Sequence, residues 1–290
     1  MLDLLWTRLK QGHRTMTYPD GPPPELPERF VGRPTIDQGR CAPGCRACAE
    51  ACPTGAIALR PATTPRTPLA SREDLSSPGN ATSTSGASLL ADHPNGTPQV
   101  HLDLGKCLFC RACQPACPAE AICFTRDYRL AASRRDDLII SGAEQLACSL
   151  NETARRLFGR SLRLRQVSAG GCNACEADTN VLGTLAWDIG RFGIQFVASP
   201  RHADGLLITG PVSQNMRLAL EKTYQAVPSP KIVIAVGACA TSGGPYAGHP
   251  ETLDGASSLI TVDLFVPGCP PHPLTILDAL LGFLGQTAER

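Results

Sequence analysis

The chain has 290 residues, with 27 Lys or Arg against 26 Asp or Glu, so its formal net charge is +1. This length favours about two domains, and the near-neutral charge excludes the strong basic field that is typical of nucleic-acid-binding proteins. Fourteen cysteines are the unusual feature. Because they cluster at short spacings and no signal-peptide core precedes them, we expect metal thiolates in a reducing compartment rather than disulfides. No apolar run approaches the roughly 18 residues of a membrane span, which predicts a soluble or peripheral protein.

The first expected element is a short amphipathic helix over residues 2–10. Its apolar stripe at helical spacing consists of Leu2, Leu5, Trp6 and Leu9, and Arg8, Lys10 and Arg14 lie beside it. We favour a helix that packs on the protein or on a partner, and the alternative is a helix on a membrane surface. The proline-rich stretch 15–38 is expected to run extended along the surface, so we treat residues 1–38 as an N-terminal extension.

An internal repeat follows, in which residues 41–57 and 107–122 share one pattern. Each copy has three close cysteines, a fourth cysteine followed by proline, and then an Ala-Ile strand. The insert between them, roughly 60–98, is rich in Pro, Thr, Ser and Gly and has no hydrophobic period, so we expect a flexible surface loop. We assign residues 39–135 to one domain and residues 136–160 to a linker.

The cysteine spacing of this repeat is typical of 4Fe–4S proteins. The second copy, Cys107-x2-Cys110-x2-Cys113-x3-Cys117-Pro118, is the bacterial two-cluster ferredoxin run. The first copy, Cys41-x3-Cys45-x2-Cys48-x3-Cys52-Pro53, is one residue longer between its first two cysteines. Two zinc knuckles are the alternative, but zinc sites commonly consist of two short Cys pairs separated by a spacer.

In such a run the proline turns the fourth thiolate toward the other cluster, so crossed pairing is expected. The first cluster then takes Cys41, Cys45, Cys48 and Cys117. The second takes Cys107, Cys110, Cys113 and Cys52.

From residue 161 the sequence changes to alternating strands and helices. Strands are expected over 162–167, 194–198, 205–209, 231–236 and 262–266, and helices over 179–192, 216–224 and 273–284. Strands separated by helices form a parallel sheet with covered faces. Ligand sites in such sheets lie beyond the carboxyl ends of the strands.

Four more cysteines fall at those strand ends. Cys172 and Cys175 follow the first strand, and Cys239 and Cys269 follow two later ones, each beside glycines. A single one of them could be a buried structural cysteine, but four at strand ends indicate a third 4Fe–4S cluster. Cys123 and Cys148 fit no ligand spacing and are expected to be ordinary buried or free thiols.

Several polar side chains near this third set have two interpretations. Glu176 and Asp178 could relay protons beside the cluster, or could stabilise the N-terminus of the following helix. Arg201 could lie near the cluster or form a surface ion pair. His202, His249 and His272 have no ligand partner at useful spacing and are expected to be solvated.

These residues also carry a family resemblance. The region from Leu162 onward resembles the small subunit of membrane-bound, energy-converting NiFe hydrogenases, including the formate hydrogenlyase type, and is similar to the cluster-bearing 20 kDa subunit of complex I. The matching motifs are Cys172-x-x-Cys175, Ile194-Gln195-Phe196-Val197-Ala198-Ser199-Pro200-Arg201 and Gly210-Pro211-Val212. The complex I subunit has its first two cysteines side by side, so the spacing here favours the hydrogenase.

Residues 1–135 look like the two-cluster ferredoxin subunit of the same complexes. The motifs are Tyr18-Pro19, Phe30-x-Gly32-x-Pro34, the Cys-Pro-x-x-Ala-Ile runs and Asp127-Tyr128-x-Leu130-Ala131. The chain therefore resembles a fusion of two neighbouring subunits. It departs from the family at Ala174, where glycine is usual, and at Asp178, where glutamate is more common.

The resemblance implies an α/β flavodoxin-like parallel-sheet domain over 161–290, preceded by an α+β two-cluster bacterial ferredoxin-like domain. It implies an electron-transfer subunit with three 4Fe–4S clusters, which serves a NiFe centre on a separate large subunit and lies at the cytoplasmic face of the membrane beside membrane-embedded subunits. No catalytic NiFe centre on this chain and no nucleic-acid partner are expected. The alternatives are a complex I-like NADH:quinone oxidoreductase subunit and a stand-alone soluble ferredoxin.

Overall fold

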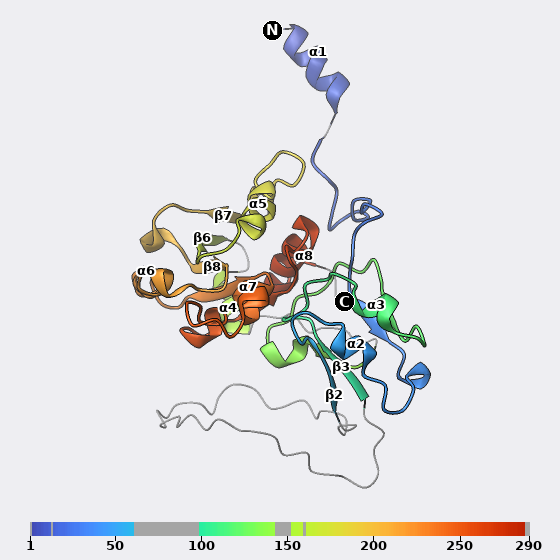
Figure 1. Ribbon diagram of the computed structural model, residues 1–290. Coiled ribbons are helices and arrows are strands. Elements are labelled where there is room, and N and C mark those ends of the chain that lie inside the picture. Colours follow the sequence, from blue (N-terminus) through green and yellow to red (C-terminus); the bar gives the residue numbers. More distant parts are fainter. Residues whose placement is uncertain (1, 13, 61–98, 143–151, 159–160, 288–290) are drawn as a thin grey trace.

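The structure, a computed structural model, describes residues 2–12, 14–60, 99–142, 152–158 and 161–287. Figure 1 shows an N-terminal half of short strands packed against a C-terminal half built around a larger sheet. Helix α1 (Leu2–Gln11) stands away from both halves.

The N-terminal half contains two small antiparallel sheets. One pairs β1 (Pro34–Ile36) with β4 (Ile122–Phe124), and the other has the order β2 (Ile57–Arg60), β3 (Gln99–Asp103), β5 (Ile139–Ile140). The one-turn helices α2 (Ala47–Glu50) and α3 (Cys113–Ala116) occupy equivalent places in the two copies of the repeat. This half therefore mixes short helices with antiparallel strands, as expected.

Two segments that we predicted to lie outside the repeat domain contribute strands to its sheets. Strand β1 lies within residues 1–38, which we expected to be only an extension, and β5 lies within the expected linker 136–160. Leu138 and Ile140 from that linker are buried at 0% and 1% exposure, so they complete the core of the small sheet. Strands of two or three residues are too short to leave a periodic signal in a sequence.

The C-terminal half is a five-stranded parallel sheet with helices packed against it. Its strands are β6 (Leu162–Ser168), β7 (Ile194–Phe196), β8 (Gly205–Thr209), β9 (Ile232–Val236) and β10 (Leu264–Val266). Its helices are α5 (Ala174–Val181), α6 (Gln214–Ala226), α7 (Ala238–Ser242) and α8 (Pro273–Leu284), and a further helix, α4 (Glu152–Phe158), precedes β6. The strand order β7-β6-β8-β9-β10 is one of the two common orders of doubly wound sheets. All five expected strands are present.

The core of this half explains why its strands were readable from the sequence. Strands β8 and β9 are buried along their whole length, and helix α8 is buried on almost every side. Strands covered on both faces are continuous apolar runs, and a helix that is apolar all round is a buried one. The helix expected over 179–192 is wrong, because α5 ends at Val181 before Gly183, and only a short 3-10 turn forms at Ile189–Phe192.

The two halves are joined by backbone and side-chain contacts. Ala132 and Phe265 exchange two backbone hydrogen bonds, of 3.1 and 2.9 Å, which cover the otherwise open edge of β10. The Ser242 hydroxyl donates to the Gly105 carbonyl at 2.7 Å. These contacts fix the position of the repeat against the carboxyl end of the sheet.

The stretch expected to be extended does run across both halves. The Met16 amide donates to the Ala186 carbonyl at 3.0 Å, and the Gly32 amide donates to the Thr125 carbonyl at 2.9 Å. Between these points Tyr18 is buried, and its hydroxyl donates to the carboxylate of Asp278 at 2.7 Å. The segment therefore ties the two halves together.

The insert between the two cysteine runs lies outside the described residues apart from Arg60. Its ends meet, because β2 and β3 are antiparallel and Arg60 lies opposite Gln99. A two-residue turn can join strands in this register.

We therefore expect that replacing residues 61–98 with Asn-Gly leaves the iron content of the chain unchanged and its melting temperature equal or slightly higher, since a shorter loop costs less entropy to close. An iron assay and a thermal melt of the anaerobically purified variant measure this. Loss of iron would mean that the insert supports the repeat.

Candidate functional site

The four cysteines expected at the first cluster line one cavity in the structure. Cys41, Cys45, Cys48 and Cys117 surround it, and the rest of its wall is apolar, with Val100 and Ile122 among the lining residues. Cys48 lies in α2, and Cys117 follows the last residue of α3. Three cysteines of the first copy and the fourth cysteine of the second copy thus line one site, which is the crossed arrangement.

The other four cysteines of the repeat line a second cavity. Cys52, Cys107, Cys110 and Cys113 surround it, and Ile57, Leu102 and Phe124 form much of its apolar wall. In the loop between Cys107 and Cys113, Phe109 and Arg111 have positive φ angles of 55° and 64°. The first copy has Gly44 in this conformation, at φ 76°. Gly44 lies between Cys41 and Cys45, where this copy is one residue longer than the second.

Backbone amides point at several of these sulfurs. The Ala56 amide donates to Cys52 Sγ at 3.2 Å, and the Ala121 amide donates to Cys117 Sγ at 3.3 Å, which are equivalent bonds in the two copies. The Phe109 amide donates to Cys107 Sγ at 3.3 Å. Such bonds favour the negative form of sulfur and are one of the means by which proteins set a cluster's reduction potential.

The third set gathers at the carboxyl edge of the parallel sheet. Cys172 and Cys175 follow β6, Cys239 lies in α7 directly after β9, and Cys269 follows β10. Glycines leave room for the sulfurs: a Cβ on Gly237 would lie 2.6 Å from Cys175 Sγ, and one on Gly244 would lie 2.9 Å from Cys239 Sγ. Cys172 and Cys269 are exposed, so this site opens on the surface.

The thiols of each group raise one another's pKa. Burial raises the pKa of Cys107 to about 12. The charges of neighbouring thiols act in the same direction, and a backbone hydrogen bond acts against it. Burial and the charges of Cys269 and Cys172 raise the pKa of Cys239 to about 11. Thiolates crowded in this way need bound cations to offset their repulsion.

The donor set of each site fits an iron–sulfur cluster. Four sulfur donors with apolar surroundings suit iron–sulfur clusters, whereas carboxylate and carbonyl oxygens suit Mg²⁺ or Ca²⁺. In the described part of the chain, no three His, Cys, Asp or Glu side chains are placed to hold a single metal ion. The cysteines of the repeat surround cavities instead of meeting at one point.

A surface hollow borders both the second and the third set. Leu108 and Phe109, from the loop between Cys107 and Cys110, line it together with Cys269, and Asp178 lies on the same wall. The second and third groups of thiols are therefore neighbours across this hollow.

Glu176 is a buried hydrogen-bond acceptor. Its side chain is 6% exposed, and its Oε1 accepts hydrogen bonds of 2.6 Å from the hydroxyls of Ser168 and Thr209. Burial opposes ionisation, but these hydrogen bonds prevail and lower the pKa of Glu176. The carboxylate thus ties α5 to the ends of β6 and β8, although neither hydroxyl was recognised from the sequence.

Asp178 differs from Glu176 in its surroundings. It is half-buried and faces the hollow, and burial raises the pKa of its carboxyl group. A carboxyl group whose pKa is raised is better suited to exchanging protons near neutral pH than one whose pKa is lowered.

The expectation that His272 is solvated is wrong, and for Arg201 the structure disfavours one of its two alternatives, a place near the cluster. His272 is not solvated: it is half-buried, its Nδ1 accepts a hydrogen bond from the Leu274 amide at 3.1 Å at the start of α8, and its ring packs edge-on against Phe30 and Trp187. Arg201 is exposed in a turn between Val197 and Asp204. Those two residues hydrogen bond to Leu164 and Arg163 near the amino end of β6, which places Arg201 away from the thiols. His202 and His249 are exposed, as expected.

Cys123 lies on β4 with its side chain exposed, outside all three groups, and Cys148 lies outside the described residues. We expect Cys123→Ser and Cys148→Ser each to keep the full iron content, because neither thiol belongs to a group of four. Iron and sulfide assays of the two variants measure this, and a cluster lost from either one would show that a ligand has been misassigned.

Two family models match the chain. Residues 40–121 match the 4Fe-4S dicluster domain, and residues 172–283 match the NADH ubiquinone oxidoreductase 20 Kd subunit. The first range includes all eight cysteines of the repeat, and the second includes the four at the edge of the parallel sheet. None of the described helices has the length and apolar character needed to cross a membrane.

Curated relatives come from two kinds of complex. The chain is 42% identical to the probable membrane-bound hydrogenase subunit mbhJ of Pyrococcus furiosus, over 46% of this chain and 80% of the relative. It is 37% identical to formate hydrogenlyase subunit 7 of Escherichia coli, over 51% and 58% of the two chains. It is 40% identical to an NADH-quinone oxidoreductase subunit of Clostridium beijerinckii, over 38% and 66%.

Proposed function

Because the chain belongs to the family that unites the 20 kDa subunit of NADH ubiquinone oxidoreductase with membrane-bound hydrogenase subunits, we propose that it is an electron-transfer subunit of a membrane-associated NiFe hydrogenase complex. In this role it resembles a fusion of two subunits of a formate hydrogenlyase-like complex. Residues 39–135 form the two-cluster ferredoxin domain together with the flanking strands β1 and β5, which complete its sheets. Residues 161–290 form the flavodoxin-like domain, a description that the strand order supports.

The proposal rests on one observation, the gathering of twelve of the fourteen cysteines into three groups of four. We assign one 4Fe–4S cluster to each group, and such a cluster, when bound, supplies reversible one-electron transfer. The chain itself supplies the thiolate ligands and the amide donors to Cys52, Cys107 and Cys117. Buried apolar residues, Val100 at the first site and Leu102 at the second, line the two cavities of the repeat.

The third site is the one that suits a partner's metal centre. Cys172 and Cys269 are exposed at the carboxyl edge of the sheet, so another subunit can approach this group closely. We place the NiFe centre on a separate large subunit at this edge, with Asp178 available to move protons. Membrane-embedded subunits hold the assembly at the cytoplasmic face of the membrane.

The experiment is an anaerobic purification of the tagged chain from membranes of its native host, followed by metal analysis and a hydrogen-evolution assay. A co-purified partner that contains nickel, together with hydrogen evolution, is the expected result. A nickel-free assembly that reduces quinone would support the complex I-like alternative, which the Clostridium relative also favours. Recovery of the chain by itself would support the stand-alone ferredoxin.

A further inference from the structure

Helix α1 presents large apolar side chains to solvent. Leu5, Trp6 and Leu9 are 59%, 63% and 83% exposed, at spacings that place them on one side of a helix. The first form of our expectation, packing on the chain itself, is therefore wrong, whereas packing on a partner stays a prediction, and Figure 1 shows the helix projecting from the body of the molecule. The exposed side requires another explanation.

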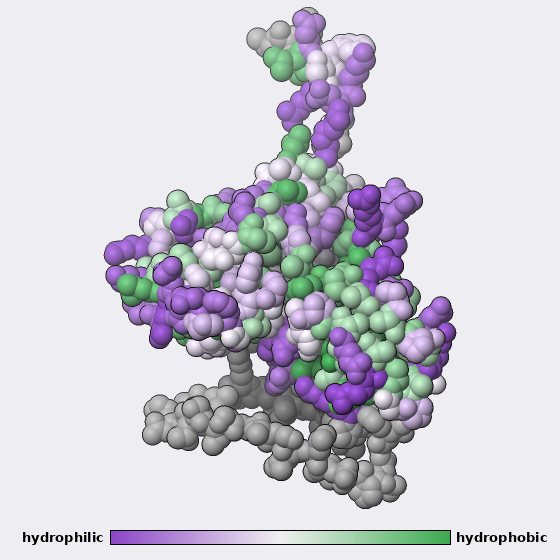
Figure 2. Space-filling model, in the orientation of Figure 1, coloured by the Kyte–Doolittle hydropathy of each residue, from purple (hydrophilic) through white to green (hydrophobic). Residues whose placement is uncertain are grey.

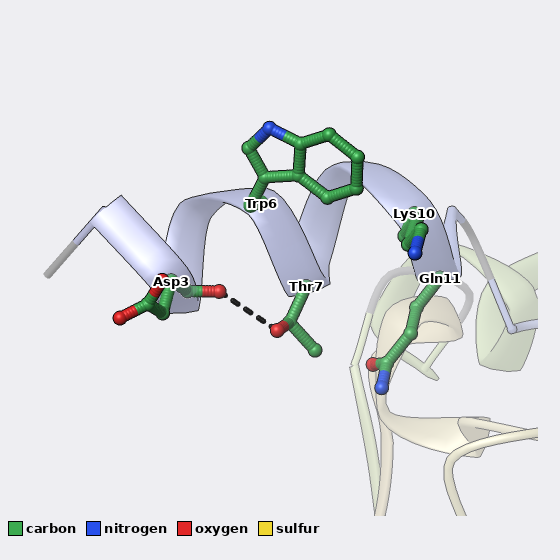
Figure 3. Close-up of a pocket in the computed structure, with 5 residues that line it drawn as sticks. All are labelled: Asp3, Trp6, Thr7, Lys10 and Gln11. Carbon is green, nitrogen blue, oxygen red and sulfur yellow. Dashed lines mark hydrogen bonds between the residues drawn. The ribbon is translucent and has the colours of Figure 1, made fainter.

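The polar residues of α1 are arranged around this stripe. With 3.6 residues per turn, Arg8 lies on one flank of the stripe and Lys10 on the other. Lys10 Nζ lies 4.9 Å from the centre of the Trp6 ring. Figure 3 shows Trp6 on one side of the helix and Asp3, Thr7 and Gln11 away from it, with the Thr7 hydroxyl bonded to the Asp3 carbonyl. Figure 2 shows the same mixture of apolar and polar residues on the projecting helix.

We propose that α1 is an interfacial anchor that lies flat on an anionic lipid surface. The stripe of Leu5, Trp6 and Leu9 inserts at the level of the headgroups, where tryptophan is favoured. The flanking cations of Arg8 and Lys10 extend along the helix sides to the lipid phosphates. This arrangement suits an anionic bilayer, because the apolar stripe can face the acyl chains while the basic residue on each flank reaches the negatively charged headgroups.

The connection to the body permits this orientation. Gly12 follows the helix with φ +59° and has no heavy atom within 4 Å of the position a Cβ would take. A glycine in open space lets the helix tilt without disturbing the domains that carry the thiols. Arg14, two residues after Gly12, is exposed and adds a third positive charge near the surface. The anchor thus goes beyond the electron-transfer role and does not depend on it.

The test is co-sedimentation of the full, anaerobically purified chain with vesicles. One set is phosphatidylcholine alone, and the other contains phosphatidylglycerol. We expect binding to the anionic vesicles that weakens with salt. Leu5→Ser/Leu9→Ser is expected to lower partitioning by at least about tenfold. Arg8→Glu/Lys10→Glu is expected to lower it by a similar factor on anionic vesicles, since each basic residue contributes about fivefold.

The matched control is Leu4→Ser. Leu4 is 77% exposed but lies off the stripe, so this single change matches each of the two changes in the Leu5/Leu9 variant in its cost in helix propensity and in its loss of apolar surface. It is expected to bind as the wild-type chain does, and equal iron content verifies that all the variants are folded. The proposal is overturned if the wild-type chain prefers neither vesicle, or if the Leu5/Leu9 variant sediments like the Leu4 variant. Either result would favour a protein partner for this helix.

Discussion

A Cys175→Ser/Cys239→Ser variant is expected to lose about four of the roughly twelve irons that the three proposed 4Fe–4S clusters would bring to the chain. It is also expected to abolish hydrogen turnover by the assembled complex. Both cysteines belong to the group at the carboxyl edge of the parallel sheet, where Gly237 and Gly244 leave space for their sulfurs. Removing two of four ligands leaves a site that cannot hold a cluster.

The rest of the molecule should tolerate this change. The first two groups of thiols lie in the other half and make their own amide hydrogen bonds, so about eight irons should remain. Cys123→Ser is the control for a cysteine removed outside any group. Iron and sulfide assays, with hydrogen evolution measured in parallel, decide the matter. Eight irons in the wild-type chain would refute a third cluster, and bound zinc would refute all three assignments.

The cysteine groups could be predicted because their signal is local. A run of four cysteines within about a dozen residues encodes its own loop and needs no knowledge of the remaining fold. The third group was accessible for a different reason: buried parallel strands are apolar throughout, so their ends could be located, and Cys239 and Cys269 stand at those ends.

What the sequence did not reveal depends on contacts between distant segments. Nothing around Ser168 or Thr209 indicates that both hydroxyls donate to Glu176: the pairing of β6 with β8 sets the two hydroxyl residues side by side, and Glu176 reaches them from α5. Likewise His272 was expected in solvent because its position in the chain does not show that Phe30 and Trp187 cover it.

The helix expected over 179–192 failed for a local reason. Its apolar residues had helical spacing, but the chain turns at Gly183, and Ile189 and Phe192 are placed by the 3-10 turn before β7. Hydrophobic spacing indicates which residues are buried, whereas a glycine within the run weakens the inference that one continuous helix buries them.

The two acids beside the third group are expected to respond differently to loss of charge. If the hydrogenase role holds, Asp178→Asn should lower hydrogen turnover by roughly 10²–10⁴, the usual range for loss of a general acid or base. Asp178 faces the hollow beside Cys269, and burial raises the pKa of its carboxyl group, which favours proton exchange there over exchange at Glu176, whose pKa is lowered. Glu176→Gln should leave turnover within a few-fold of wild type, because the amide oxygen can still accept from Ser168 and Thr209.

The stability of the variants also distinguishes the structural role of Glu176 from the proton-transfer role of Asp178. Glu176→Ala removes the 2.6 Å acceptor of both hydroxyls and leaves buried Thr209 only its longer contact of 3.4 Å with the Val167 carbonyl, so it should lower the free energy of unfolding by about 1–3 kcal/mol. Asp178→Asn keeps the size of a half-buried side chain and should change the melting temperature little. The measurements are hydrogen evolution by the assembled complex, iron content and a thermal melt for all three variants. If Asp178→Asn retains wild-type turnover with its iron complete, Asp178 carries no proton in the reaction. If Glu176→Gln loses turnover instead, the proton passes through the buried acid in spite of its lowered pKa.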